Sequence, residues 1–463
     1  MPGSGGSSEK DGEENHEIEA RPTKEFFIDM LTKDIELVPA IVDLVDNSID
    51  GARRHKQDRA WDGLRVTVTV KPGYFEIADN CGGIEAELAR KVAFRFGRPS
   101  DATGIPGSIG VFGVGMKRAL FKLAREFRVN SVAPNSMFSL HLNVEDWKGK
   151  SVWNFDFDTS DETKRHPFSE TYTKIVVSDP LDSAKQDFQR SSFWEDLLRE
   201  IREKESQAIE NGLEIRVETP DGGHRIEVEP KRLLRSAEIT PAFVRRRVGE
   251  NGGAVDLSLY VGIERLGTGT DPAAAGWYVY CNDRLIVGAD KSSATGWGED
   301  EWGEDIPAYH NQFAWFRGYA FFESSDPSRL PWNTAKTELD QSSVVMREAK
   351  EEMAGLMRPV IDFLNAVDSE KPFLGPDGSP TAGTPLTALV LRAKSVELPS
   401  LRRREEFFPS KLPKKHPRQQ PNNVGYFRPQ KDIDILKQVF NVASNRAVGE
   451  KSFDYTLKRE RPR

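Results

Sequence analysis

The chain has few cysteines and no long apolar run. Cys81 and Cys281 are its only cysteines among 463 residues, too few for a disulfide framework or a cysteine metal site. No apolar run approaches the roughly 18 residues that span a bilayer, and the opening MPGSGGSSEKDGEEN lacks the apolar core of a signal peptide. We therefore expect a reduced, cytoplasmic protein that makes no membrane contact.

The charge of the chain is unevenly distributed. The net charge is −8, yet residues 400–463 hold 16 Lys and Arg against 7 Asp and Glu, so that end is +9 and the remainder −17. A basic end of this kind is typical of a solvated terminus, or of a segment that binds DNA or an acidic protein. Its aromatic residues also fit stacking on bases.

Composition and length predict two to three globular domains. Hydrophobic residues make up 37% of the chain, which is enough for a sizeable core. The pattern of apolar and turn-forming residues predicts five segments: a disordered start at 1–19, an α+β domain at 20–185, a second α/β domain at 186–368, a Pro/Gly-rich and basic linker at 369–430 and a short helical module at 431–463.

The first domain is expected to pack helices on an antiparallel sheet. Residues 21–54 and 117–127 have helical periodicity, and 64–80 contains two strand-like runs around Lys71-Pro72-Gly73, which is typical of a β-hairpin. Further strands are expected at 127–133, 138–144, 152–158 and 173–179. In the second domain, a hairpin is expected around Asp221-Gly222-Gly223 and a long helix is expected to end near Val367.

One predicted helix carries unusual acidity. In AIVDLVDNSIDGARR (40–54), helical spacing places Asp43, Asn47 and Asp50 on one face, with Asp46 to one side. A wet acidic face would explain this pattern. A second explanation is chemical, because an amide oxygen can ligate Mg²⁺ and a carboxylate can activate water.

Two glycine-containing stretches follow. IADNCGGIE (77–85) places Asp79 at a strand end before two glycines, where a carboxylate can accept from an exocyclic amine and a planar ring can approach the backbone. GIPGSIGVFGVGMK (104–117) leads through five glycines into a helix with Lys117 in its first turn, as in a phosphate-binding loop. It is not a Walker loop, because no G-K-[ST] completes the spacing.

Together these stretches resemble the GHKL ATPase superfamily, which includes gyrase B, MutL, MORC proteins and histidine kinases. DLVDNSIDGA resembles its helix motif, DNCGGI its adenine motif, GSIGVFGVGMK its lid, and Thr173 its strand threonine. The resemblance spans 38–176 and implies a Bergerat-type two-layer α/β sandwich that binds ATP and Mg²⁺. It implies Asp43 as general base and Asn47 as Mg²⁺ ligand. The ATP-binding residues that it implies are Asn47, Asp50, Asp79, Gly83, Ile84, Gly110, Gly113, Val114, Gly115, Lys117 and Thr173.

The second domain resembles the transducer domain of the MutL/MORC branch, which sends a lysine to the γ-phosphate. LPWNTAKTELDQ (330–341) resembles the lysine loop and implies a catalytic role for Lys336, and YCNDRLI (280–286) resembles a strand near it. Two positions depart from the family pattern. Asp43 stands where the usual base is Glu, and its shorter side chain places the carboxylate about 1 Å farther from the attacking water, a misplacement that can cost about a hundredfold. Either the backbone compensates for this difference, or hydrolysis is slow. Cys81 replaces the first glycine of the adenine motif.

Three functions remain open at this level. The first is an ATPase that acts as a dimeric, ATP-gated clamp or switch on DNA or a partner protein, for which the resemblance suggests prokaryotic defence or DNA maintenance. The second is a nucleotide-sensing regulatory subunit with negligible hydrolysis, which the change at Asp43 would fit. The third is a protein kinase of the histidine-kinase branch. No histidine lies in a helical dimerisation segment ahead of the motifs, which disfavours the third.

Overall fold

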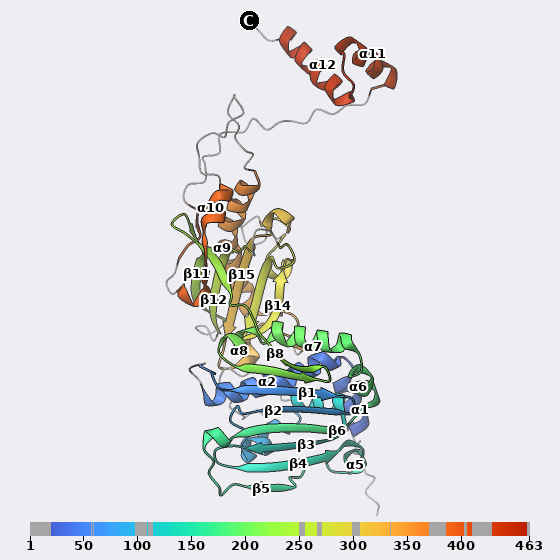
Figure 1. Ribbon diagram of the computed structural model, residues 1–463, viewed down its shortest axis with the longest axis vertical. Coiled ribbons are helices and arrows are strands. Elements are labelled where there is room, and N and C mark those ends of the chain that lie inside the picture. The colour runs from blue at the N-terminus through green and yellow to red at the C-terminus, as the bar shows by residue number, and fades with distance from the viewer. Residues whose placement is uncertain are drawn as a thin grey trace, which may run out of the picture. The chain divides into compact units, whose positions relative to one another are not determined.

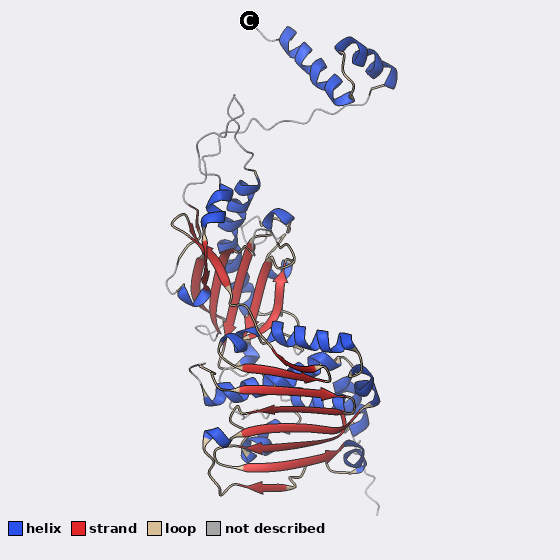
Figure 2. Cartoon of the chain, in the orientation of Figure 1, coloured by secondary structure: helices blue, strands red, loops and turns tan. Residues whose placement is uncertain are grey.

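The structure is a computed structural model, and it contains both helices and extended sheets (Figures 1 and 2). It describes residues 20–56, 58, 60–97, 109, 114–249, 255–265, 271–298, 306–333, 335–369, 386–401, 405–409 and 428–460. The chain divides into one compact unit that ends at Ser410 and a second unit at Lys411–Arg463. The expected α+β fold class is confirmed.

The larger unit begins with an eight-stranded sheet. Its order is β5-β4-β3-β6-β2-β1-β7-β8, and every neighbouring pair is antiparallel except β1–β7. The alternation of Val66, Val68 and Val70 inward explains why β1 has one buried face. The strands are β1 Arg65–Lys71, β2 Tyr74–Asp79, β3 Ala124–Val132, β4 Met137–Asn143, β5 Thr159–Asp161, β6 Tyr172–Pro180, β7 Glu214–Thr219 and β8 Gly222–Arg225.

Helices pack together beside this sheet. Helix α2 (Leu37–His55) contacts α4 (Gly115–Leu123), which in turn contacts α1 (Lys24–Thr32). In α2 the apolar positions expected at helical spacing, such as Ile41, Val45 and Ile49, are fully buried. Shorter helical segments are α3 Ala86–Leu88, a π-helix at Ala89–Ala93, α5 Val144–Gly149 and α6 Asp182–Asp187.

A second sheet of five strands follows in the same unit. Its order is β11-β12-β15-β13-β14, with β13 and β15 parallel. Helix α9 (Val344–Asp368) packs against β11, β12 and β15. Helices α7 (Ser191–Lys204) and α8 (Ser206–Glu210) both contact β14, and α7 also contacts α2, so they connect the two parts. The strands are β11 Ala242–Val248, β12 Val255–Ile263, β13 Gly276–Cys281, β14 Arg284–Asp290 and β15 Phe316–Glu323.

Several segments differ from expectation. The hairpin β7–β8 belongs to the first sheet because β7 pairs with β1, although a domain boundary was expected at 185. The helix expected through Phe127 ends at Leu123, and β3 begins at the next residue. Residues 152–158 were expected to form a strand but contain none, and the aromatic rings of Trp153 and Phe155 pack on Phe96 instead.

The segment expected as a linker at 369–430 contains folded structure where it is described. Helix α10 (Leu386–Arg392) is followed by β16 (Lys394–Glu397), which pairs with β9 (Arg232–Arg235). Strand β17 (Phe408–Pro409) pairs with β10 (Ile239–Thr240). The buried ring of Phe407 lies 5.8 Å from that of Phe363 in α9. The apolar residues of 386–407 therefore pack onto the larger unit.

The smaller unit is helical where it is described. Helices α11 (Gln430–Phe440) and α12 (Asn445–Glu460) contact each other and occupy the region expected to be a short helical module. No helix among the described residues has the length and apolar character needed to cross a membrane.

Candidate functional site

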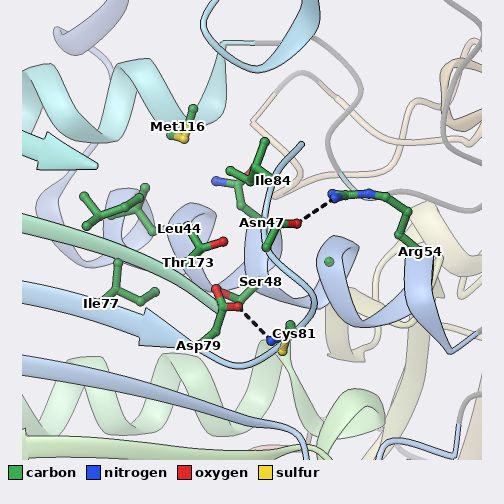
Figure 3. A pocket seen from close by; sticks show the side chains of 13 residues that line it. Leu44, Asn47, Ser48, Arg54, Ile77, Asp79, Cys81, Ile84, Met116 and Thr173 are labelled. Carbon is green, nitrogen blue, oxygen red and sulfur yellow. Dashed lines mark hydrogen bonds between the residues drawn. The ribbon is translucent and has the colours of Figure 1, made fainter. Parts of the chain in front are cut away.

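A pocket lies between α2, the end of β2 and β6 (Figure 3). The space between its walls is about 390 Å³, a figure that includes open solvent at its mouth. Four elements and one turn contribute to its wall. Its lining residues are Leu44, Asn47, Ser48, Gly51, Arg54, Ile77, Asp79, Cys81, Gly83, Ile84, Met116, Thr173 and Ile175.

Asp79 provides the acceptor at the closed end of this pocket. Its Oδ2 accepts from the Ser48 hydroxyl at 2.7 Å and its Oδ1 accepts from the Cys81 backbone N–H at 2.9 Å. Burial raises the pKa of Asp79, although these hydrogen bonds and the Arg54 charge oppose the rise. Thr173 is its direct partner across β2 and β6. The strand pairing thus brings together the two residues that the motifs nominated for the adenine.

The turn after Asp79 requires glycine at two positions. Gly82 and Gly83 have φ of 101° and 69°, in the left-handed region. A Cβ on Gly83 would lie 2.1 Å from the carbonyl oxygen of Val132, and one on Gly82 would lie 2.0 Å from the His55 ring. Cys81 is buried with no positive φ, so the turn accepts a side chain at that position. Arg54 closes the turn by donating to the Gly83 carbonyl at 3.2 Å.

A charged cluster lies on the same helix, one turn from the pocket. The buried carboxylate of Asp43 accepts from Arg118 of α4 at 2.6 Å through Oδ2 and from Lys336 at 3.5 Å through Oδ1. Asn47 donates from Nδ2 to the Asp43 carbonyl at 2.8 Å, which fixes the orientation of its amide. This hydrogen bond joins Asn47, which lines the pocket, to Asp43 in the charged cluster.

Lys336 reaches this cluster from the loop after β15. Its Nζ lies 2.7 Å from Oδ2 of Asp46 as well as 3.5 Å from Asp43. Burial alone would lower the pKa of Lys336, but Asp46 and Asp43 raise it above its usual value, so the side chain stays charged. Its φ of 57° is left-handed, a strain that persists where the surroundings fix the backbone, often at functional positions.

Two further buried groups complete the cluster. Arg284 of β14 lies 2.5 Å from Asp46 and 3.3 Å from Glu205, which stands at the break between α7 and α8. Burial would raise the pKa of Asp46, but Arg284 and Lys336 lower it overall. Burial and the neighbouring Asp46 raise the pKa of Glu205 well above its usual value. The cluster therefore combines residues from both sheets and from the connecting helices.

The remaining nominated residues lie in different surroundings. The Lys117 ammonium donates to the Ala93 carbonyl at 2.6 Å, and burial lowers its pKa to about 7. Asp50 accepts from the Ile109 N–H at 2.6 Å. Val114 and Gly115 stand at the start of α4, where a Cβ on Gly115 would be 3.6 Å from the Asp43 carboxylate. Gly110 and Gly113 lie outside the described residues.

Sequence reasoning did not nominate Arg118, Ser48, Asp46 or Arg284. The lid motif pointed to a cation at the start of α4, and Arg118 stands one position after the lysine that was chosen. Arg284 lies inside the YCNDRLI stretch that was noted only as a strand. Ser48 follows the motif asparagine directly, so its proximity to the strand end was available from helical geometry.

The described residues contain no group of three or more His, Cys, Asp and Glu side chains arranged for a metal. A magnesium ion at a nucleotide site keeps most of its water and substrate ligands and needs only one or two protein groups. The amide of Asn47 is the nominated protein ligand.

Comparison with known families agrees with this geometry. Residues 35–173, about 30% of the chain, match the model of the histidine kinase-, DNA gyrase B- and HSP90-like ATPase family. The matched segment contains α2, the glycine turn that follows Asp79, α4 and Thr173. A search of curated proteins finds no match to the chain. The family match supports the GHKL superfamily and ATP binding for this part of the molecule.

Proposed function

We propose that the chain binds and hydrolyses Mg-ATP through this site. The observation that supports hydrolysis most strongly is the position of Lys336, 293 residues beyond Asp43 in sequence, within ion-pair distance of that carboxylate. A lysine brought so far along the chain to the motif helix, in a strained backbone conformation, fits a role at the transferred phosphate. This position also supports the comparison of the second sheet and its loop with a MutL/MORC-type transducer domain.

The pocket beside Asp79 would recognise the adenine ring of ATP. Asp79 presents an acceptor for the exocyclic amine of adenine, with Thr173 beside it, and Gly83 and Ile84 let the ring approach the backbone. The ribose and phosphates would then extend along α2 towards Asp43. Helix α4 begins at Gly115 beside that carboxylate, and the backbone N–H groups of a helix N-terminus suit an anion such as phosphate.

The charged cluster around Asp43 would carry out hydrolysis of the terminal phosphate. Mg²⁺, held by the Asn47 amide oxygen and the nucleotide, would neutralise charge on the triphosphate. Asp43 would orient and deprotonate the attacking water, and Lys336 would stabilise negative charge on the terminal phosphoryl group. Asp43 must first exchange at least one of its ion pairs, since both of its oxygens are engaged. The pairing and the short side chain both favour slow turnover.

A nucleotide sensor with negligible hydrolysis is the second candidate. The ion pairs of Asp43 favour this candidate, because a carboxylate that is bound by Arg118 at 2.6 Å is not free to accept a proton from water. In either case we infer an ATP-dependent switch in which nucleotide binding alters the contact between the two sheets. Homodimer formation on ATP binding, and contact with DNA or a protein through residues 400–463, are the further proposals that the family resemblance and the basic end support.

Calorimetry of Mg-ATP binding together with phosphate release tests both candidates. Wild type should bind ATP and release phosphate slowly, and Asn47→Ala should bind Mg-ATP far more weakly. Thr337→Ala, an exposed neighbour of Lys336, is the control for protein quality. Binding without phosphate release would favour the sensor. Absence of ATP binding in wild type would refute the proposed function.

A further inference from the structure

In the buried cluster, Asp43 and Asp46 each have a guanidinium partner in addition to Lys336. Asp43 is paired with Arg118 at 2.6 Å and Asp46 is paired with Arg284 at 2.5 Å. Each buried carboxylate thus already has a guanidinium partner. Glu205 lies 3.3 Å from Arg284, and burial and the neighbouring Asp46 raise its pKa. Lys336 is the additional positive charge, shared between Asp46 and Asp43.

The two kinds of cation differ in how they are held. Arg284 projects from the start of β14 and its side chain is 3% exposed, so the strand fixes its position. Lys336 projects from a loop that is closed by Lys336 N–H to Asn333 carbonyl and by Thr337 N–H to Asn333 Oδ1. A single ammonium on a flexible stem can move between anions more readily than a guanidinium fixed by a strand.

From this arrangement we propose that Arg284 is a positioning residue, which neutralises Asp46 while Lys336 leaves it for the terminal phosphate of the nucleotide. The inference rests on the proposed function, since it needs a phosphate to receive the lysine. The Arg284 side chain is 3% exposed and already pairs with Asp46 and Glu205, so it acts through Lys336 and not through contact with the nucleotide. No bond is made or broken in this step, because it exchanges one ion pair for another.

The energetic reason is the penalty for an unpaired buried charge. Asp46 is 1% exposed, and removing one partner of such a carboxylate is strongly unfavourable. With Arg284 present, Asp46 remains paired after Lys336 leaves. Without Arg284, Lys336 would be the sole cation on Asp46 and would be retained there. Removal of Arg284 would therefore lower kcat, which depends on Lys336, and would leave binding of the adenine ring unchanged.

The same hairpin offers a matched control. Asp283, the residue before Arg284, forms a buried ion pair with Arg53 of α2 at 2.6 Å. This pair joins the same helix to the same β13–β14 turn, but it contains neither Lys336 nor Asp46. Asp283→Asn removes one charge from it, and asparagine accepts the left-handed φ of 70° at that position. A general weakening of the contact between the two parts would appear equally in this variant.

The experiment measures Mg-ATP affinity by calorimetry and kcat by phosphate release on the full chain. Arg284→Gln should lower kcat on the order of tenfold to a hundredfold with affinity largely retained, as expected for misplacement of a catalytic group. Arg284→Lys, which keeps the charge, should be intermediate, and Asp283→Asn should turn over like wild type. Adding Asp46→Asn to Arg284→Gln should restore part of kcat, because the anion that retains Lys336 is gone.

The decisive result is a rescue of kcat with unchanged ATP affinity and an unchanged free energy of unfolding, since relief of an unpaired buried charge would raise stability as well. A double variant no faster than Arg284→Gln, with ATP binding intact, overturns the inference, and so does an Arg284→Gln variant with wild-type kcat. If Arg284→Gln does not fold, Arg284→Lys with and without Asp46→Asn gives the same comparison, and a slower double variant overturns it. Failure of wild type to bind ATP instead refutes the proposed function, and the inference with it.

Discussion

Helix α2 has two different environments along its length. Around Ser48, Gly51 and Arg54 it borders a pocket where Asp79 accepts two hydrogen bonds. Around Asp43 and Asp46, one turn earlier, it is enclosed by three cations from other elements. The first environment is suited to recognising a neutral ring and the second to handling charge. We therefore expect that substitutions at different positions along α2 affect ATP binding and ATP hydrolysis separately.

The largest expected effect is at the charged end. Lys336→Met should lower kcat by about a hundredfold to a thousandfold, the usual effect of removing a group that stabilises developing charge. ATP affinity should change much less, because Lys336 is absent from the pocket wall. Phosphate release and calorimetry measure the two quantities. Equal losses of kcat and affinity would show that the two ends do not act separately.

The complementary change is at the pocket end. Asp79→Asn should weaken ATP binding by about 1.5–3 kcal/mol, since it removes a charged hydrogen-bond acceptor, while kcat at saturating ATP stays closer to wild type. Discrimination between ATP and GTP should narrow in the same calorimetric series. Glu76→Gln, on the same strand but outside the pocket, is the control. Unchanged affinity in Asp79→Asn would remove Asp79 from the site.

A third substitution tests the geometry of the turn. Gly83→Ala should lower the free energy of unfolding by about 1–3 kcal/mol through backbone strain, and the 2.1 Å approach to Val132 adds to this loss. Gly73→Ala is the matched control, because Gly73 also has a positive φ but nothing lies within 4 Å of its added Cβ. Urea unfolding measures both variants. Equal losses would show that the close approach is relieved at little cost.

The smallest expected effect concerns Lys117. Its pKa of about 7 in the folded protein lies below its ordinary value, so the unfolded chain binds the extra proton between those values. The free energy of unfolding should therefore rise with pH above about 7, by at most about 1.4 kcal/mol per pH unit. This gain is lost again as the pH falls towards 7. Lys117→Met should flatten this rise in urea unfolding at pH 7 to 9, whereas Lys122→Met on the same helix should not.

The sequence pattern predicted those helices and turns that depend on residues close together in the chain. The spacing of α2, the hairpin β1–β2 and the long helix α9 follow from periodicity and turn residues, and all three are present. The motif order also nominated Asp79 and Thr173, which strand pairing places opposite each other. These features depend on neighbours in sequence, or on motifs that the family resemblance supplied.

Long-range pairing was not available from such patterns. The parallel contact of β7 with β1 and the return of β16 to β9 join segments whose own sequences do not specify a partner strand. The contact between Arg118 and Asp43 could not be predicted for a related reason. Adjacent residues on a helix point about 100° apart, and only the tertiary structure shows that Arg118 meets Asp43. The roles of Asp46 and Arg284 likewise require both sheets.

The most direct test of the division along α2 is Asp43→Asn, measured by calorimetry with Mg-ATP and by phosphate release. The asparagine is nearly isosteric and lies outside the pocket wall. Our account predicts ATP affinity close to wild type and a kcat lowered by about a hundredfold or more, as for loss of a general base. A variant that hydrolyses ATP at the wild-type rate, or that loses binding and turnover together, would contradict it.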